Sequence, residues 1–236
     1  MRLFRLLPLA AAGLLTWYVR KVHRFRDPVR VVGAGADAGG DRGADTVLSP
    51  ADGLVSFVRR VSNGQIQAGL SGTPLRLRDV LGAPGADGWL LGILVGPLDV
   101  HYTYQPVGGK ITAVTHRGSR ADVPLLSLPA LLGVLTGRVP ELLETRGALE
   151  NERLSVSTQT GQGDVTVTLV GPGSGLNALP FLREGDQGRV AHKLAFVPEG
   201  ALVLLHLPEA LVPLVSVGDR VVGTQTVIAQ TVTAQG

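Results

Sequence analysis

The sequence predicts a mostly β protein (β with minor α) whose main body is an antiparallel β domain. From Thr46 onward, short runs of β-forming residues alternate with turn residues. Runs at 53–58, 89–95 and 201–207 are separated by breaks such as Ser62-Asn63-Gly64. This regular spacing of short strands and turns is typical of an antiparallel sheet.

One stretch of the domain departs from the β pattern. Residues 123–149 are rich in leucine and interrupted by prolines, and four leucines follow helical spacing: Leu128, Leu131, Leu132 and Leu135. We expect one or two short helices inserted in the sheet. The pattern fits either a buried core or an apolar surface that faces lipid.

Two similar Gly-Asp turns lie in the C-terminal half, at 184–186 and 217–221. Such turns between short strands are typical of lipoyl and biotinyl carriers, so we expect a lipoyl/biotinyl-like barrel-sandwich portion. A carrier also presents a modifiable lysine at a hairpin tip. Because Lys110 and Lys193 lie in no such context, carrier function is not expected.

An apolar stretch at residues 6–19 lies between basic residues near the N-terminus. It is shorter than the roughly 20 residues that a membrane-spanning helix needs. The apolar core at 6–9, ahead of Ala10-Ala11-Ala12, is also shorter than the roughly 7–15 residues of a signal peptide. The basic flank and Trp17-Tyr18 favour a helix at an anionic membrane surface, or a short tilted span. A buried N-terminal helix is the alternative.

Composition divides the chain into three parts: a membrane-associated segment with its basic flank (1–30), a Gly- and Ala-rich linker (31–45) and the β domain (46–236). The net charge is only +3 and aromatic residues make up 4%, so nucleic-acid binding is not expected. Cysteine is absent, which excludes disulfides and thiolate sites. The five histidines lack metal-ligand spacing, so no metal is expected.

Five segments, in order along the chain, resemble the phosphatidylserine decarboxylase family, particularly its short bacterial form. They are Phe25–Pro28 (FRDP), Ser49–Gly53 (SPADG), Leu98–His101 with its continuation to Ile111, Asn151–Arg153 (NER) and Val217–Ala229. Each segment alone is short. All five in register make a chance match remote, so the sequence is identified as a member of this family.

The resemblance implies a decarboxylase that makes its own cofactor. In the family, a serine after a glycine attacks the preceding carbonyl, the resulting ester is eliminated, and the new N-terminus becomes a pyruvoyl group. That group forms a Schiff base with the substrate amine and accepts electrons during decarboxylation. The resemblance places Asp52 in the machinery that activates the serine and gives His101 a role in decarboxylation or substrate positioning. The alternatives are a turn residue at Asp52 and a structural histidine on a strand at His101. Longer members have a second histidine where this chain has Tyr104.

The family serine is missing. The short form reads EGD, then a fixed interval, then Gly-Ser and a strand ending in Leu-Pro. Here the interval is residues 187–200, and the next residue is Ala201, at the catalytic position of the missing pyruvoyl serine. Alanine has no hydroxyl with which to form the ester, so no cofactor is expected. The neighbouring Pro198 and Glu199 also differ from the short form.

The sequence therefore predicts a pseudoenzyme of phospholipid metabolism that binds phospholipid or regulates an active enzyme. The alternative is an active decarboxylase that makes phosphatidylethanolamine with a pyruvoyl group formed at an unexpected serine. The pairs Gly118-Ser119 and Gly173-Ser174 lie outside the register and are interpreted as ordinary turns. The expected partners are a phospholipid membrane, phosphatidylserine as a candidate ligand, and either a second copy of the chain or an active homologue. The expected location is the cytoplasmic face of the inner membrane.

Overall fold

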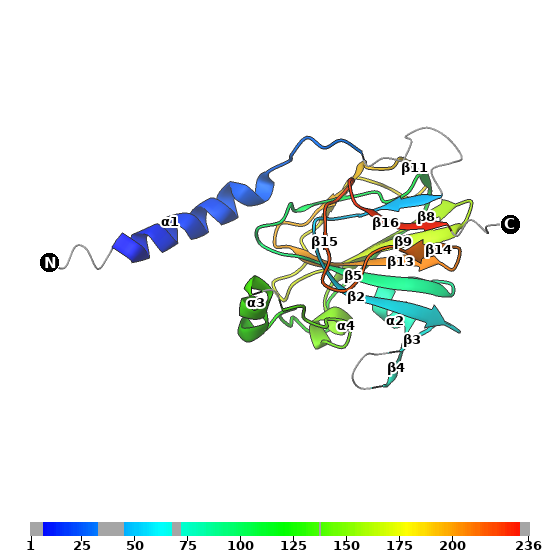
Figure 1. Ribbon diagram of the computed structural model, residues 1–236, viewed down its shortest axis with the longest axis horizontal. Helices are drawn as coiled ribbons and strands as arrows, with labels where there is room; N and C mark the ends of the chain where they lie inside the picture. Colours follow the sequence, from blue (N-terminus) through cyan, green and yellow to red (C-terminus); the bar gives the residue numbers. More distant parts are fainter. Residues whose placement is uncertain (1–6, 33–44, 68–71, 137, 232–236) are drawn as a thin grey trace.

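The computed structural model describes residues 7–32, 45–67, 72–136 and 138–231, and within them the chain is mostly antiparallel β (Figure 1). The helical elements are α1 (Leu7–Lys21), the 3-10 helix η2 (His23–Phe25), α2 (Leu77–Leu81), α3 (Leu128–Leu135) and α4 (Arg146–Glu150). Helix α1 projects away from the β domain, and α3 lies at the end of the domain nearest to it (Figure 1).

The strands pair in one large sheet and two small ones. In chain order they are β1 (Thr46–Leu48), β2 (Gly53–Ser62), β3 (Gln65–Gln67), β4 (Pro74–Arg76), β5 (Gly88–Val95), β6 (Tyr102–Tyr104), β7 (Gly109–Arg117), β8 (Arg153–Thr160), β9 (Gly163–Val170), β10 (Leu179–Pro180), β11 (Gln187–Gly188), β12 (Lys193–Phe196), β13 (Ala201–Pro208), β14 (Leu211–Pro213), β15 (Arg220–Val221) and β16 (Val227–Thr231). The ten-stranded sheet has the order β11-β7-β8-β9-β13-β5-β2-β3-β4, with β15 paired to β2. The small sheets are β1-β16-β14 and β10-β12-β6.

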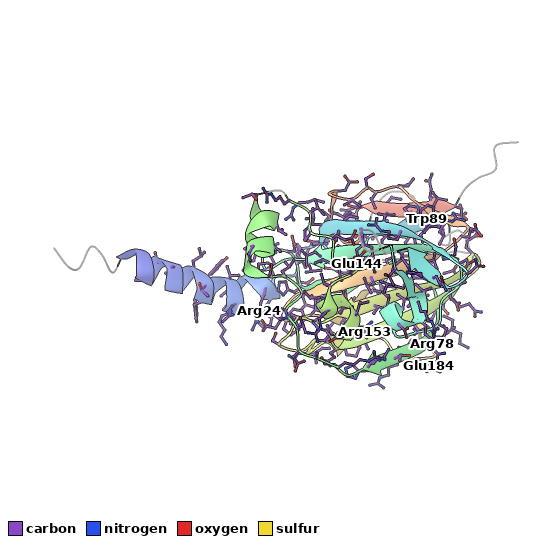
Figure 2. All side chains as sticks on the ribbon, turned by 90° about the horizontal axis from the view of Figure 1, so that it is seen from below. Arg24, Arg78, Trp89, Glu144, Arg153 and Glu184 are labelled. Atoms are coloured by element: carbon purple, nitrogen blue, oxygen red, sulfur yellow. The ribbon has the colours of Figure 1, made fainter. Side chains whose placement is uncertain are left out.

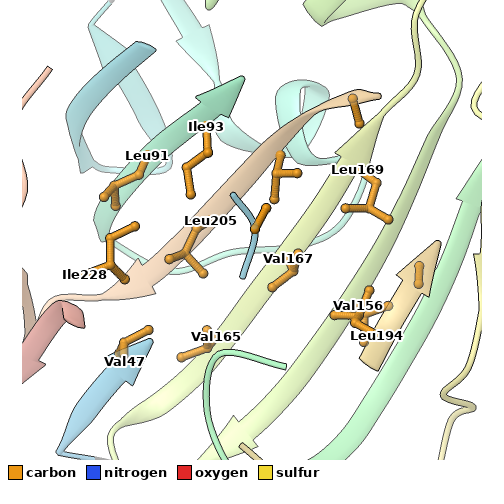
Figure 3. Close-up of a cluster of buried hydrophobic side chains, with 14 of the residues drawn as sticks. Val47, Leu91, Ile93, Val156, Val165, Val167, Leu169, Leu194, Leu205 and Ile228 are labelled. Atoms are coloured by element: carbon orange, nitrogen blue, oxygen red, sulfur yellow. The ribbon is translucent and has the colours of Figure 1, made fainter. Parts of the chain in front are cut away.

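Strand β13 lies inside the large sheet, hydrogen-bonded to β5 on one side and β9 on the other. All of its residues are buried, and its sequence is a nearly unbroken apolar run, as expected for a strand covered on both faces. One face packs on the two small sheets through a core that includes Leu205, Val167 and Ile228 (Figure 3). The opposite face packs on α2 and α4. The register pairs Ala201 with Val95, so the start of β13 lies beside the end of β5.

The predicted mostly β, antiparallel fold is confirmed, and so is the helical insertion: α3 lies within residues 123–149, and α4 begins there and ends at Glu150. The large sheet follows an open path of strands, and the lipoyl-like portion remains a prediction. Most of the predicted linker, residues 33–44, lies outside the described residues. An N-terminal helix is present, but no helix in the described part of the chain combines the length and apolar character needed to cross a bilayer.

The side chain of Arg153 is buried where α2, α4 and β8 meet (Figure 2). Its guanidinium donates hydrogen bonds to four backbone carbonyls, those of Asp79 (2.9 Å), Val80, Ala148 (3.2 Å) and Asn151 (3.3 Å). These carbonyls include helix-end groups that lack partners within their own short helices. Burial lowers the pKa of Arg153 to about 10, which still leaves the guanidinium charged at neutral pH. The NER segment therefore joins the end of α4 to the start of β8.

We predict that Arg153→Met destabilises the fold by about 3 kcal/mol, because it leaves several buried carbonyls without donors. Urea unfolding followed by circular dichroism measures this change. Arg78→Met is the matched control, since Arg78 lies exposed on α2 and should change stability by less than about 0.5 kcal/mol. Equal effects of the two variants would contradict a structural role for the buried guanidinium.

Candidate active site

A cavity of about 440 Å³ lies at the end of the large sheet where β5 ends and β13 begins. Its lining is mostly apolar. It comprises Leu54, Leu94, Val95, Gly96, Pro97, Leu98, Asp99, Asp122, Pro124, Leu125, Leu126, Val134, Pro172, Gly173, Ser174, Glu199, Gly200, Ala201 and Arg220. Val134 belongs to α3, so the inserted helix forms part of the wall. The volume is in the ordinary range for small-molecule sites, roughly 300–1,000 Å³.

Ala201 lines this cavity as the first residue of β13 and is buried. A tight turn precedes it, in which the Gly200 amide donates to the Val197 carbonyl at 3.1 Å. Gly200 has φ +77°, and a Cβ there would lie 2.8 Å from the Val95 carbonyl oxygen. Only glycine fits such a position without strain. The Gly-Ala step therefore keeps a defined backbone geometry on the cavity wall.

The residues present do not fit a pyruvoyl group at this step. Forming it requires a hydroxyl on the residue after Gly200, and Ala201 offers only a methyl group to the cavity. The chain contains no cysteine, which removes the other strong side-chain nucleophile.

His101 contacts the same turn. Its Nδ1 lies 3.1 Å from the Pro198 carbonyl oxygen, to which it donates, and its own carbonyl accepts from the Val197 amide at 2.9 Å. The ring is buried, and its Nε2 has no hydrogen-bond partner in the described part of the chain. Burial lowers the pKa of His101, so the imidazole is neutral at neutral pH. The structure therefore brings His101 and Ala201 to one turn.

Asp52 lies in a different environment. Both of its carboxylate oxygens accept from Arg30, at 2.5 and 2.7 Å, and one also accepts from the Gly223 amide at 2.8 Å. The Arg30 guanidinium also lies over the Tyr104 ring, 5.3 Å from its centre. Within the described residues, no hydrogen bond joins Asp52 to His101 or Ala201. In this chain Asp52 anchors the segment that follows α1.

The segment that follows α1 also contacts two loops at the cavity rim, the loop of Leu98 and the loop of Pro198 and Glu199. Arg24, at the junction of α1 with the domain in Figure 2, donates to the Pro198 carbonyl at 3.3 Å and pairs with Glu199 at 2.9 Å. Arg26 donates to the Leu98 carbonyl at 2.7 Å. Because Leu98 and Glu199 both line the cavity, the segment after α1 and the cavity rim are physically connected.

Charged residues of the cavity were missed by sequence reasoning. Asp99 pairs with Arg220 at 3.0 Å and accepts from the Gly96 amide at 2.8 Å. Asp122 and Glu199 line other parts of the wall. Asp99 and Arg220 do lie inside two of the five family-like segments, which is the signal that could have found them. Asp122 and Glu199 carry no such signal.

Asn151, also missed as a site residue, fixes two walls of the cavity together. Its side-chain amide donates to the Val123 carbonyl at 2.6 Å and to the Gly171 carbonyl at 2.9 Å. These residues lie next to the lining segments 124–126 and 172–174. The pair Gly173-Ser174 lies in a turn, as expected, and is in addition part of the cavity wall.

We predict that acidification destabilises the fold through His101. Because its pKa is lowered in the folded chain, the unfolded chain binds more protons just below the ordinary value of 6.5. The stabilisation that neutral His101 gives is therefore fully present above about pH 6.5, and it is lost as the pH falls through the pKa that His101 has in the folded chain. Urea unfolding at about pH 7.5 and about pH 5 measures the loss. His101→Gln should reduce it, whereas His192→Gln, at an exposed histidine, should not; equal pH dependence in both variants would contradict the assignment.

Comparison with known proteins identifies the family of this chain. The pattern of the family described as phosphatidylserine decarboxylase matches residues 18–229. A putative archaetidylserine decarboxylase proenzyme of Methanocaldococcus jannaschii is 26% identical over 208 residues, which cover 88% of this chain and 88% of that protein. Phosphatidylserine decarboxylase proenzymes of Erythrobacter litoralis and Granulibacter bethesdensis are 27% and 29% identical, covering 87% of this chain and 71% and 68% of their own lengths. The match spans both rim loops, the inserted helices and the Gly200-Ala201 turn, and the chain belongs to the phosphatidylserine decarboxylase family.

Proposed function

We propose that this chain is a membrane-associated, phospholipid-binding pseudoenzyme of its family that forms no pyruvoyl group. The observation that carries the proposal is the methyl group of Ala201 on the wall of an intact cavity. The tight turn before Ala201 is formed. The backbone at this position is therefore in place, and what is missing is the side-chain hydroxyl oxygen that would react. Binding can persist without that oxygen because the apolar walls do not depend on it.

The form of the cavity supports a lipid ligand. Leucine, valine and proline side chains dominate its lining, and charged groups are few. Such a surface suits the glycerol and upper acyl region of a phospholipid, with the charged residues left for the headgroup. Apolar cavities with a small number of placed polar groups are the usual form of small-ligand sites.

The N-terminal helix supports association with a membrane. Leu14, Leu15 and Trp17 are exposed on α1, and Arg20 and Lys21 follow in its last turn. Exposed apolar and aromatic side chains beside bases favour an anionic bilayer surface. The cytoplasmic face of the inner membrane supplies such a surface, and the contacts of Arg24 and Arg26 connect α1 to the cavity rim.

An active decarboxylase is the second candidate, and one observation favours it. Gly173-Ser174, interpreted as an ordinary turn, lines the same cavity as Ala201. Its turn has a hydrogen bond from the Gly175 amide to the Pro172 carbonyl at 3.0 Å. A serine nucleophile needs a base held within hydrogen-bond reach, and in the described residues no side chain hydrogen-bonds the Ser174 hydroxyl. The pseudoenzyme therefore fits the geometry better.

We predict that the purified full-length protein is a single uncleaved chain of 24.6 kDa without a reactive carbonyl. The reason is that Ala201 has no hydroxyl to form the ester and be eliminated. Intact-mass spectrometry with parallel hydrazide labelling tests this. A carbonyl-bearing fragment of residues 174–236 would contradict the proposal and identify Ser174 as the processed residue, and a fragment of 201–236 would contradict the role given to Ala201.

We also predict that reversing charge at the end of α1 weakens membrane binding. Each basic residue near an anionic surface contributes about 1 kcal/mol, so Arg20→Glu with Lys21→Glu should reduce binding to phosphatidylglycerol vesicles at least about tenfold. Vesicle sedimentation measures the bound fraction. Arg76→Glu with Arg78→Glu, at exposed positions of β4 and α2, is the matched control and should bind like wild type. Unchanged sedimentation of the first variant would remove α1 from the proposal.

A further inference from the structure

We infer that the cavity selects a zwitterionic, amine-bearing phospholipid headgroup of the phosphoethanolamine type over the anionic phosphoserine type. This inference rests on the proposed phospholipid binding and names the ligand class of that same site. It concerns which headgroup the cavity binds when no pyruvoyl group is present to form a Schiff base with the headgroup amine. The argument depends on the charges that line the cavity and on how each one is already used.

The cavity wall carries more negative than positive side chains. Asp99, Asp122 and Glu199 are acidic, and Arg220 is the basic residue of the lining. Arg220 is paired with Asp99 at 3.0 Å, and Glu199 is paired with Arg24, which approaches from the N-terminal segment, at 2.9 Å. The remaining charge is the carboxylate of Asp122, which forms no hydrogen bond or ion pair within the described residues. The lined space therefore has an uncompensated negative charge.

A ligand that complements this wall carries a cation and no second anion. Its ammonium group neutralises Asp122, whose carboxylate is exposed on the cavity wall, and the attraction has the modest strength of a solvent-exposed ion pair. Its phosphate is accommodated by Arg220, whose side chain is 66% exposed and whose guanidinium has five N–H donors, more than its bond to Asp99 uses. The glycerol and upper acyl chains then lie against the apolar lining.

A phosphoserine headgroup fits this wall less well. It adds a carboxylate beside the same ammonium, and that carboxylate would lie among Asp99, Asp122 and Glu199. Like charges brought together across a binding site disfavour binding. Because Ala201 forms no covalent bond to the amine, nothing in this chain compensates for the repulsion. Binding is then governed by headgroup charge.

Isothermal titration of the full-length protein with soluble dihexanoyl lipids tests the inference. The probes are dihexanoyl phosphatidylethanolamine, phosphatidylserine and phosphatidylglycerol, each kept below its micelle concentration. We expect the ethanolamine lipid to bind most tightly, with a preference over the serine lipid of about three- to fivefold, the range that one partly exposed charge interaction supplies. High salt should reduce this preference, because it screens the wall charges.

Asp122→Asn should lower the ethanolamine-over-serine preference to nearly one, since it removes the unpaired charge and retains the side-chain size. Asp164→Asn is the matched control. Asp164 is exposed at the start of β9, at the opposite end of the strand from Val170, which pairs with β13 beside Ala201. This control should keep the wild-type preference.

The outcomes separate the two proposals. Equal or tighter binding of the serine lipid by wild type overturns the headgroup inference and leaves phospholipid binding in place. An unchanged preference in Asp122→Asn overturns the role of the wall charge. If none of the three lipids binds wild type, phospholipid binding by this cavity fails, and the headgroup inference fails with it.

Discussion

The insertion of the Arg153 guanidinium among backbone carbonyls is the constraint on which the rest of the domain depends. Two short helices, α2 and α4, and the start of β8 meet at this point, and none of them is long enough to be stable alone. The guanidinium of Arg153, the first residue of β8, donates to carbonyls of α2, of α4 and of Asn151. Its position fixes the end of α4, and with it Asn151, which holds two cavity walls together. The site is therefore built outward from a buried structural charge.

This construction explains how the cavity survives without the family's reacting group. Its floor is strand backbone from β5 and β13, its walls are positioned by Asn151, and its rim is held by Arg24 and Arg26. None of these contacts uses a hydroxyl at position 201. The turn before Ala201 is fixed instead by Gly200, whose positive φ and close approach to Val95 are backbone properties. The shape of the cavity therefore does not depend on a hydroxyl at position 201.

The sequence predicted the antiparallel β body and the inserted helices because both depend on local patterns: short apolar runs between turns, and leucines at helical spacing. Interval length along the chain also singled out the Gly200-Ala201 step, which in the structure lies on the cavity wall. The sequence did not predict that Arg30 binds Asp52, or that Asp122 and Glu199 share a cavity with Ala201. Arg30 and Asp52, like Asp122 and Ala201, lie far apart in the chain, whereas Glu199 is only two residues from Ala201. No periodicity of the sequence encodes any of these placements.

The presence of Asp52, His101 and the NER segment could be taken as a sign of activity, but each has a structural use in this chain. Asp52 secures the segment after α1 through Arg30 and Gly223. His101 holds the Pro198 carbonyl, and Arg153 joins short helices to the sheet. Replacing any of them would leave buried partners unsatisfied, which is costly whether or not the chain reacts with a substrate. Their presence therefore follows from the stability of the fold. In the function that we propose, the residue that separates binding from catalysis is Ala201, because no structural contact of the fold requires a hydroxyl at that position.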